Sequence, residues 1–107
     1  MPMLAMCMPI LPGKLDQWKA MMEQVNATPD FANSREAAGV HERSFLQHTP
    51  AGDFLIITME GNDPAASWAQ IMSTMPPEFA EFAAEVHGLD VSAPPPPLPE
   101  LFFDSRP

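Results

Sequence analysis

The densest group of ionisable side chains in the chain is His41, Glu42, Arg43 and His48. Histidine beside carboxylates could bind a metal ion or move a proton near neutral pH. His41 and His48 are seven residues apart, so in one strand they point to opposite faces and lie about 23 Å apart. They cannot share an ion within one subunit, and the sequence predicts no metal site, no haem and no other cofactor.

These side chains belong to a predicted β-hairpin that runs from Val40 to Glu60. Two runs of β-branched and aromatic residues flank the turn residues 49–53. If Ala51 and Gly52 form the loop, Arg43 lies opposite Glu60. The favoured interpretation is an exposed cross-strand ion pair. The alternative is a buried pair that positions His41 in a pocket for proton abstraction.

Alternation along the hairpin gives it two faces of different character. The more apolar face should be covered by helices, and it carries Ser44, Leu46, His48, Leu55, Ile57 and Met59. The other face mixes apolar with charged side chains and suits a subunit interface or a small cavity. It carries His41, Arg43, Phe45, Gln47, Phe54, Ile56 and Glu60.

Composition limits the partners that the chain can have. The net charge is −9, and the five basic residues are scattered, so neither nucleic acid nor an anionic membrane is expected to bind. Charged residues make up 18% of the chain, which is below the usual value of about a quarter and favours an oligomer. Cys7 is the single cysteine, which fits a cytoplasmic setting. No apolar run approaches the length of a membrane span.

The remaining elements follow from periodicity and turn chemistry. Residues 3–11 are apolar on both alternating sets, which is typical of a central strand. Residues 94–99 form a proline-rich spacer, and Leu101–Phe103 is predicted to be a last strand that docks on the sheet. Helices are predicted over 14–26, 31–38, from 64 to about 75, and 78–87.

This order predicts a single ferredoxin-like domain over 1–107. Without the extra short helices it is β-α-β-β-α-β, an α+β fold whose antiparallel sheet has helices on one face. The other face needs a cover, and a second copy of the chain is the simplest one. We therefore expect a homodimer through the open sheet face.

The chain resembles the dimeric α+β-barrel superfamily, closest to its small uncharacterised members. The resemblance rests on MLAMCMPILPGKLDQWKAMM near the start, on SREAAGVHERSFLQHTPAGDFLIITMEGNDP in the middle, and on the tryptophan helix that follows. The superfamily includes cofactor-independent monooxygenases of aromatic polyketides, haem-degrading enzymes and stress-induced proteins. It implies a pocket between sheet and helices, which would favour Glu42, Ser44 and His48.

Two classes of function remain open. One is a monooxygenase-like enzyme or binder of a small apolar or aromatic molecule, with a pocket edged by His41, Arg43, Phe45 and Glu60, or by Glu42 and His48. The alternative is a non-catalytic dimeric binding or regulatory domain. No catalytic residue can be assigned, because fold alone does not fix a reaction.

Overall fold

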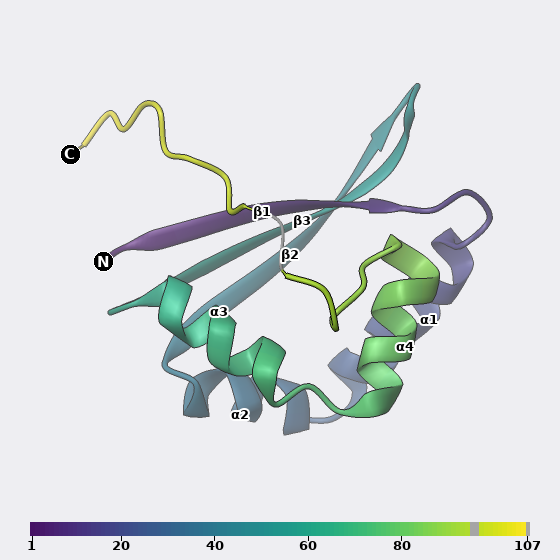
Figure 1. Cartoon of the computed structure of the whole chain (residues 1–107), viewed down its shortest axis with the longest axis horizontal. Coiled ribbons are helices and arrows are strands. Elements are labelled where there is room, and N and C mark those ends of the chain that lie inside the picture. Colours follow the sequence, from purple (N-terminus) through teal and green to yellow (C-terminus); the bar gives the residue numbers. More distant parts are fainter. Residues whose placement is uncertain (95–96, 107) are drawn as a thin grey trace.

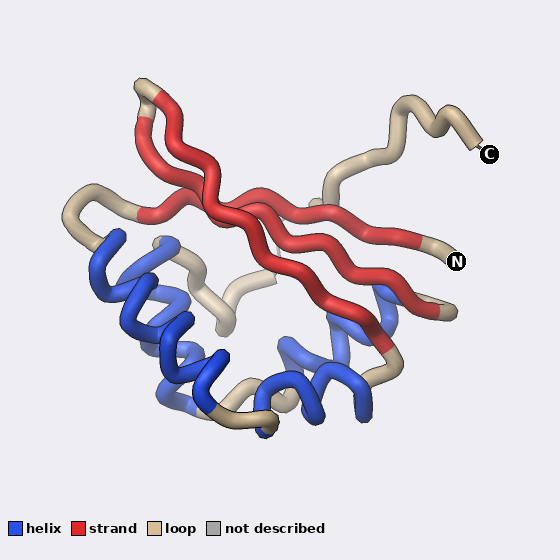
Figure 2. Tube along the Cα trace, turned by 180° about the vertical axis from the view of Figure 1, so that it is seen from behind, coloured by secondary structure: helices blue, strands red, loops and turns tan. Residues whose placement is uncertain are grey.

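The computed structural model describes residues 1–94 and 97–106. Within these residues, one antiparallel sheet of three strands lies against four helices, all on the same face of the sheet (Figures 1 and 2). The strands are β1 (Met3–Ile10), β2 (Val40–Thr49) and β3 (Gly52–Gly61), in the order β1-β3-β2. The helices are α1 (Leu15–Ala27), α2 (Asp30–Ala37), α3 (Pro64–Ser73) and α4 (Pro77–His87).

The core lies between the sheet and the helices. Alternate residues of β3 are buried, and Met59 near its end has no exposed surface. Leu4 and Met6 from β1, Trp18 from α1 and Val86 from α4 belong to the same buried cluster. The structure thus confirms that the helices cover the face predicted to be apolar.

The hairpin register differs from the prediction by two residues. Thr49 pairs with Gly52, so the loop is Pro50–Ala51. Thr49 closes this loop, since its Oγ1 accepts from the Ala51 amide at 3.1 Å and donates to the Gly52 carbonyl at 2.7 Å. Side chains alternate with a period of two, so this shift changes every cross-strand partner but leaves each side chain on its predicted face.

The prediction that the first strand is central was wrong, because β3 lies between β1 and β2. One apolar set of β1 is buried under the helices, as its double apolar pattern required. The other set lies on the open face of the sheet, where Met3 is 60% exposed and Cys7 is also exposed. The second apolar set of β1 therefore forms an uncovered apolar surface and does not indicate a central strand.

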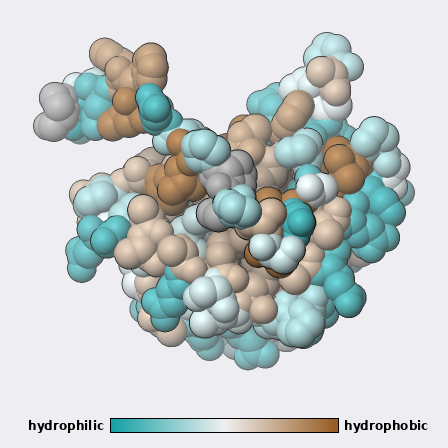
Figure 3. Space-filling model, viewed as in Figure 1, coloured by the Kyte–Doolittle hydropathy of each residue, from teal (hydrophilic) through white to brown (hydrophobic). Residues whose placement is uncertain are grey.

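The predicted C-terminal strand was also wrong. Residues 101–103 form no strand, and their side chains are 79%, 92% and 82% exposed. Three residues offer few ladder hydrogen bonds, and the prolines before them have no N–H to donate. Figure 3 shows this segment standing off from the body with apolar side chains upon it. The predicted spacer at 94–99 lies outside the described residues at positions 95 and 96.

Local signals set the ends of the helices. The Asp63 side chain caps α3 by accepting from the Ala66 amide at 3.1 Å, and Pro64 occupies the first helical position. Gly88 ends α4 in the left-handed conformation, with φ 67°. None of the helices in the described part of the chain is long and apolar enough to cross a membrane.

Candidate ligand-binding cavity

A cavity of about 1280 Å³ lies between the covered face of the sheet and the helices. It is larger than the typical small-molecule site of about 300–1000 Å³. All four described helices contribute to its lining, together with strands β1, β2 and β3. Aromatic rings and methionines form much of the wall, among them Trp18, Phe31, Trp68, Met72, Phe79 and Phe82. Such a lining favours apolar and aromatic ligands.

One partly buried ion pair lines this cavity. Nε of Arg35 on α2 donates to Oε1 of Glu42 on β2 at 2.8 Å, and the two side chains are only 19% and 10% exposed. The Arg35 guanidinium also lies over the Phe31 ring, 4.1 Å from its centre, and its Nη1 donates to the Ser34 hydroxyl at 3.3 Å. These contacts hold α2 against β2 and fix a cation beside an aromatic wall.

The aromatic wall continues from α2 to α4. Phe31 and Phe79 meet edge to face with their ring centres 6.4 Å apart. Phe82 lies one turn further along α4 and meets the His87 ring in the same way at 6.0 Å. Arg35 and His87 therefore lie at the two ends of one series of rings that lines the cavity.

His87 is the buried polar residue of the described core. Its Nδ1 lies 2.8 Å from the Pro9 carbonyl oxygen, which can only accept, so Nδ1 carries the proton. Burial lowers the pKa of the His87 imidazole, and the bond to Pro9 opposes this in part. The ring is accordingly neutral near pH 7, with an unprotonated Nε2.

A second charged group lies on the open face of the sheet. Nη1 of Arg43 donates to Oε1 of Glu60 at 2.6 Å, which confirms the predicted ion pair, although the true register makes it diagonal. The hydrogen bond from Arg43 is the main cause that lowers the pKa of the Glu60 carboxyl. His41 is directly opposite Glu60, and Phe45 is 52% exposed nearby on β2.

Only some of the predicted site residues line the cavity. Glu42 and Ser44 line it from the covered face of the sheet, and His41 and Glu60, at the end of the hairpin away from its loop, are also among its lining residues. Arg43 and Phe45 lie on the open face outside that lining. His48 lies at the hairpin tip, where its Nδ1 is 2.7 Å from Asp53 and its side chain is 63% exposed. The structure therefore does not bring these seven residues together in one site.

Sequence reasoning missed Arg35 and His87, the two polar side chains at the ends of the wall. The sequence gives no signal for the position of Arg35, because only the folded position of α2 against β2 pairs it with Glu42. His87 had a usable signal. It follows the buried Ala83 by four residues, which places it on the same face of α4.

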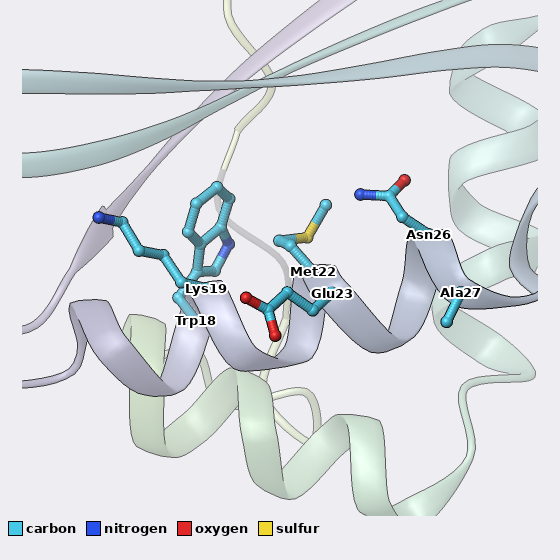
Figure 4. Close-up of a pocket in the computed structure, with 6 residues that line it drawn as sticks. All are labelled: Trp18, Lys19, Met22, Glu23, Asn26 and Ala27. Atoms are coloured by element: carbon cyan, nitrogen blue, oxygen red, sulfur yellow. The ribbon is translucent and has the colours of Figure 1, made fainter.

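A smaller hollow of about 470 Å³ runs along α1 (Figure 4). Every residue of its lining comes from that helix, and Trp18 and Met22 project from it towards the strands. Both of these side chains also line the larger cavity. A hollow beside one helix cannot surround a ligand, so the larger cavity is the candidate site.

Within residues 1–94 and 97–106, no three His, Cys, Asp or Glu side chains gather as a metal site. Comparison of the chain with protein families, with curated proteins and with solved structures gave no match.

Proposed function

We propose that this protein binds a small apolar or aromatic molecule in the cavity between its sheet and its helices. The observation that carries the proposal is the cavity itself, about 1280 Å³ in volume and lined by aromatic and methionine side chains. Apolar walls with a few fixed polar groups are the usual composition of small-molecule sites. Arg35 with Glu42, and His87, are the polar groups that would orient the ligand.

We also propose that the chain belongs to the dimeric α+β-barrel superfamily and forms a homodimer through its open sheet face. The support is the uncovered apolar surface of that face, with Met3 60% and Phe45 52% exposed. The resemblance to monooxygenases of the superfamily is the sole support for a reaction. A non-catalytic binding or regulatory dimer is the alternative, and it uses the same cavity.

Tryptophan emission can test the cavity directly, because Trp18 and Trp68 both line it. Titration with 1-methylnaphthalene should change this emission saturably. Ser44→Phe fills the cavity from β2 and should weaken binding at least tenfold. Gln47→Phe adds the same ring on the other face of the same strand and should leave binding unchanged. Absence of saturable binding to the unaltered protein would overturn the proposal.

The dimer is tested by sedimentation at micromolar concentration. The expected species has twice the mass of the chain. Phe45→Asp places an unpaired charge in the proposed interface and should give a folded monomer, since Phe45 is half exposed in the single chain. A variant that remains dimeric would show that this face is not the interface.

A further inference from the structure

We infer that His87 is a hydrogen-bond acceptor for the cavity ligand, and that the ligand is an aromatic molecule with a hydroxyl group on its ring, as in a phenol, whose O–H points to Nε2. This inference rests on the proposed function, since it names the class of molecule that the same cavity would hold. It adds a residue that determines specificity and lies on α4, far along the chain from the hairpin group.

The backbone fixes the tautomer of the ring. The Pro9 carbonyl can only accept, so the 2.8 Å contact requires a proton on Nδ1. In the neutral ring, Nε2 then carries a lone pair and can only accept a hydrogen bond. The Leu11 amide, directly after β1, also donates to the Val86 carbonyl of α4 at 2.8 Å, and this second bond helps to hold the ring in its orientation.

The surroundings of His87 keep the ring neutral. Phe82 packs against it edge to face, and burial is the leading cause of its lowered pKa. The nearest charged side chain on α4, Glu85, is paired with Lys14 at 3.0 Å on the surface. Nε2 is thus an acceptor rather than a donor near pH 7.

Nε2 is not fully buried, and His87 belongs to the cavity lining. The residue retains 9% of its surface. Among the described side chains, no fully buried nitrogen or oxygen lacks a hydrogen-bond partner, and within the described residues this ring forms its hydrogen bond through Nδ1. Nε2 therefore faces accessible space, and a ligand must either hydrogen-bond to it or leave it unpaired.

That choice defines the ligand. An aromatic ring fits the wall made by Phe79 and Phe82, and a hydroxyl group supplies the proton that Nε2 lacks. An isostere with methyl in place of hydroxyl buries Nε2 without a partner and loses affinity. A second acceptor, such as a carboxylate, would face the lone pair unfavourably.

The test compares 1-naphthol with 1-methylnaphthalene, using tryptophan emission and the full chain. The unaltered protein should bind 1-naphthol at least tenfold more tightly. His87→Phe should remove this preference while keeping affinity for 1-methylnaphthalene. Nitrogen NMR of the ¹⁵N-histidine-labelled protein needs no variant: 1-naphthol should shift the Nε2 signal of His87, and 1-methylnaphthalene should not.

The outcomes separate the two claims. Equal binding of both probes, together with an Nε2 signal that 1-naphthol leaves in place, would overturn the role of His87 and leave the cavity proposal standing. Failure of both probes to bind would overturn the cavity proposal and this inference with it.

Discussion

Replacing Glu42 with glutamine preserves the shape of the side chain and removes its charge. In the folded protein the Arg35 guanidinium would then remain in place, 19% exposed, against an uncharged partner. The amide oxygen of glutamine can still accept from Nε, so the change isolates the loss of charge from the loss of the hydrogen bond.

The expected cost follows from the burial of the pair. Breaking a fully buried ion pair costs about 3–5 kcal/mol, while an exposed pair contributes about 0–1 kcal/mol. With side chains 19% and 10% exposed, the pair lies between these limits, and Glu42→Gln should cost about 1–3 kcal/mol. For a domain of this size that lowers the melting temperature by about 5–20 °C.

Urea unfolding followed by circular dichroism measures this cost, and the chain provides a matched control. Glu60→Gln makes the same replacement in a pair of similar length, 2.6 Å, whose side chains are 47% and 29% exposed. It should cost clearly less than Glu42→Gln, because this pair is more exposed. Equal losses in both variants, or a more stable Glu42→Gln protein, would refute the argument that burial sets the contribution of each pair.

Three further predictions follow from burial and charge. Met59→Ala should lower the free energy of unfolding in urea by about 2–5 kcal/mol, because Met59 has no exposed surface; a loss as small as that of Phe45→Ala would contradict the packing. Stability should fall as the pH drops below 6.5, the ordinary pKa of a histidine in the unfolded chain. Below this pH the unfolded chain binds a proton that folded His87 takes up only at lower pH, because the pKa of His87 is lowered in the fold. This loss should level off below the folded pKa and be smaller in His87→Phe, as pH-dependent calorimetry can show. Truncation after Ala93 should leave the melting temperature unchanged in calorimetry, since the apolar side chains at 101–103 are exposed; a drop of several degrees would mean that the segment packs on the body.

The sequence predicted the elements whose signals are local. The stripe through Phe79, Ala83 and Val86 located α4, and the Asp63-Pro64 pair located the start of α3. The two hairpin faces were also correct, because alternation depends only on the strand itself. The register was wrong by two because two overlapping pairs of turn residues, Pro50–Ala51 and Ala51–Gly52, could each form the loop.

Features that depend on distant segments were not predictable in the same way. No periodicity indicates that Arg35 meets Glu42 across the turn at Gly39, or that His87 meets Pro9. Two predictions were wrong because apolar content was taken as a measure of burial: that the first strand is central, and that residues 101–103 form a docked strand. In the described chain both segments carry exposed apolar side chains.

The bond between His87 and Pro9 joins residues 78 positions apart, and this has a consequence for synthesis. As the chain emerges from the ribosome, the end of β1 must wait for almost the whole of the ordered body before α4 can close over it. Contacts between such distant residues form slowly. Until then, Ile10 at the end of β1 lacks α4 as a cover, and a nascent chain that ends before α4 presents this apolar surface to chaperones.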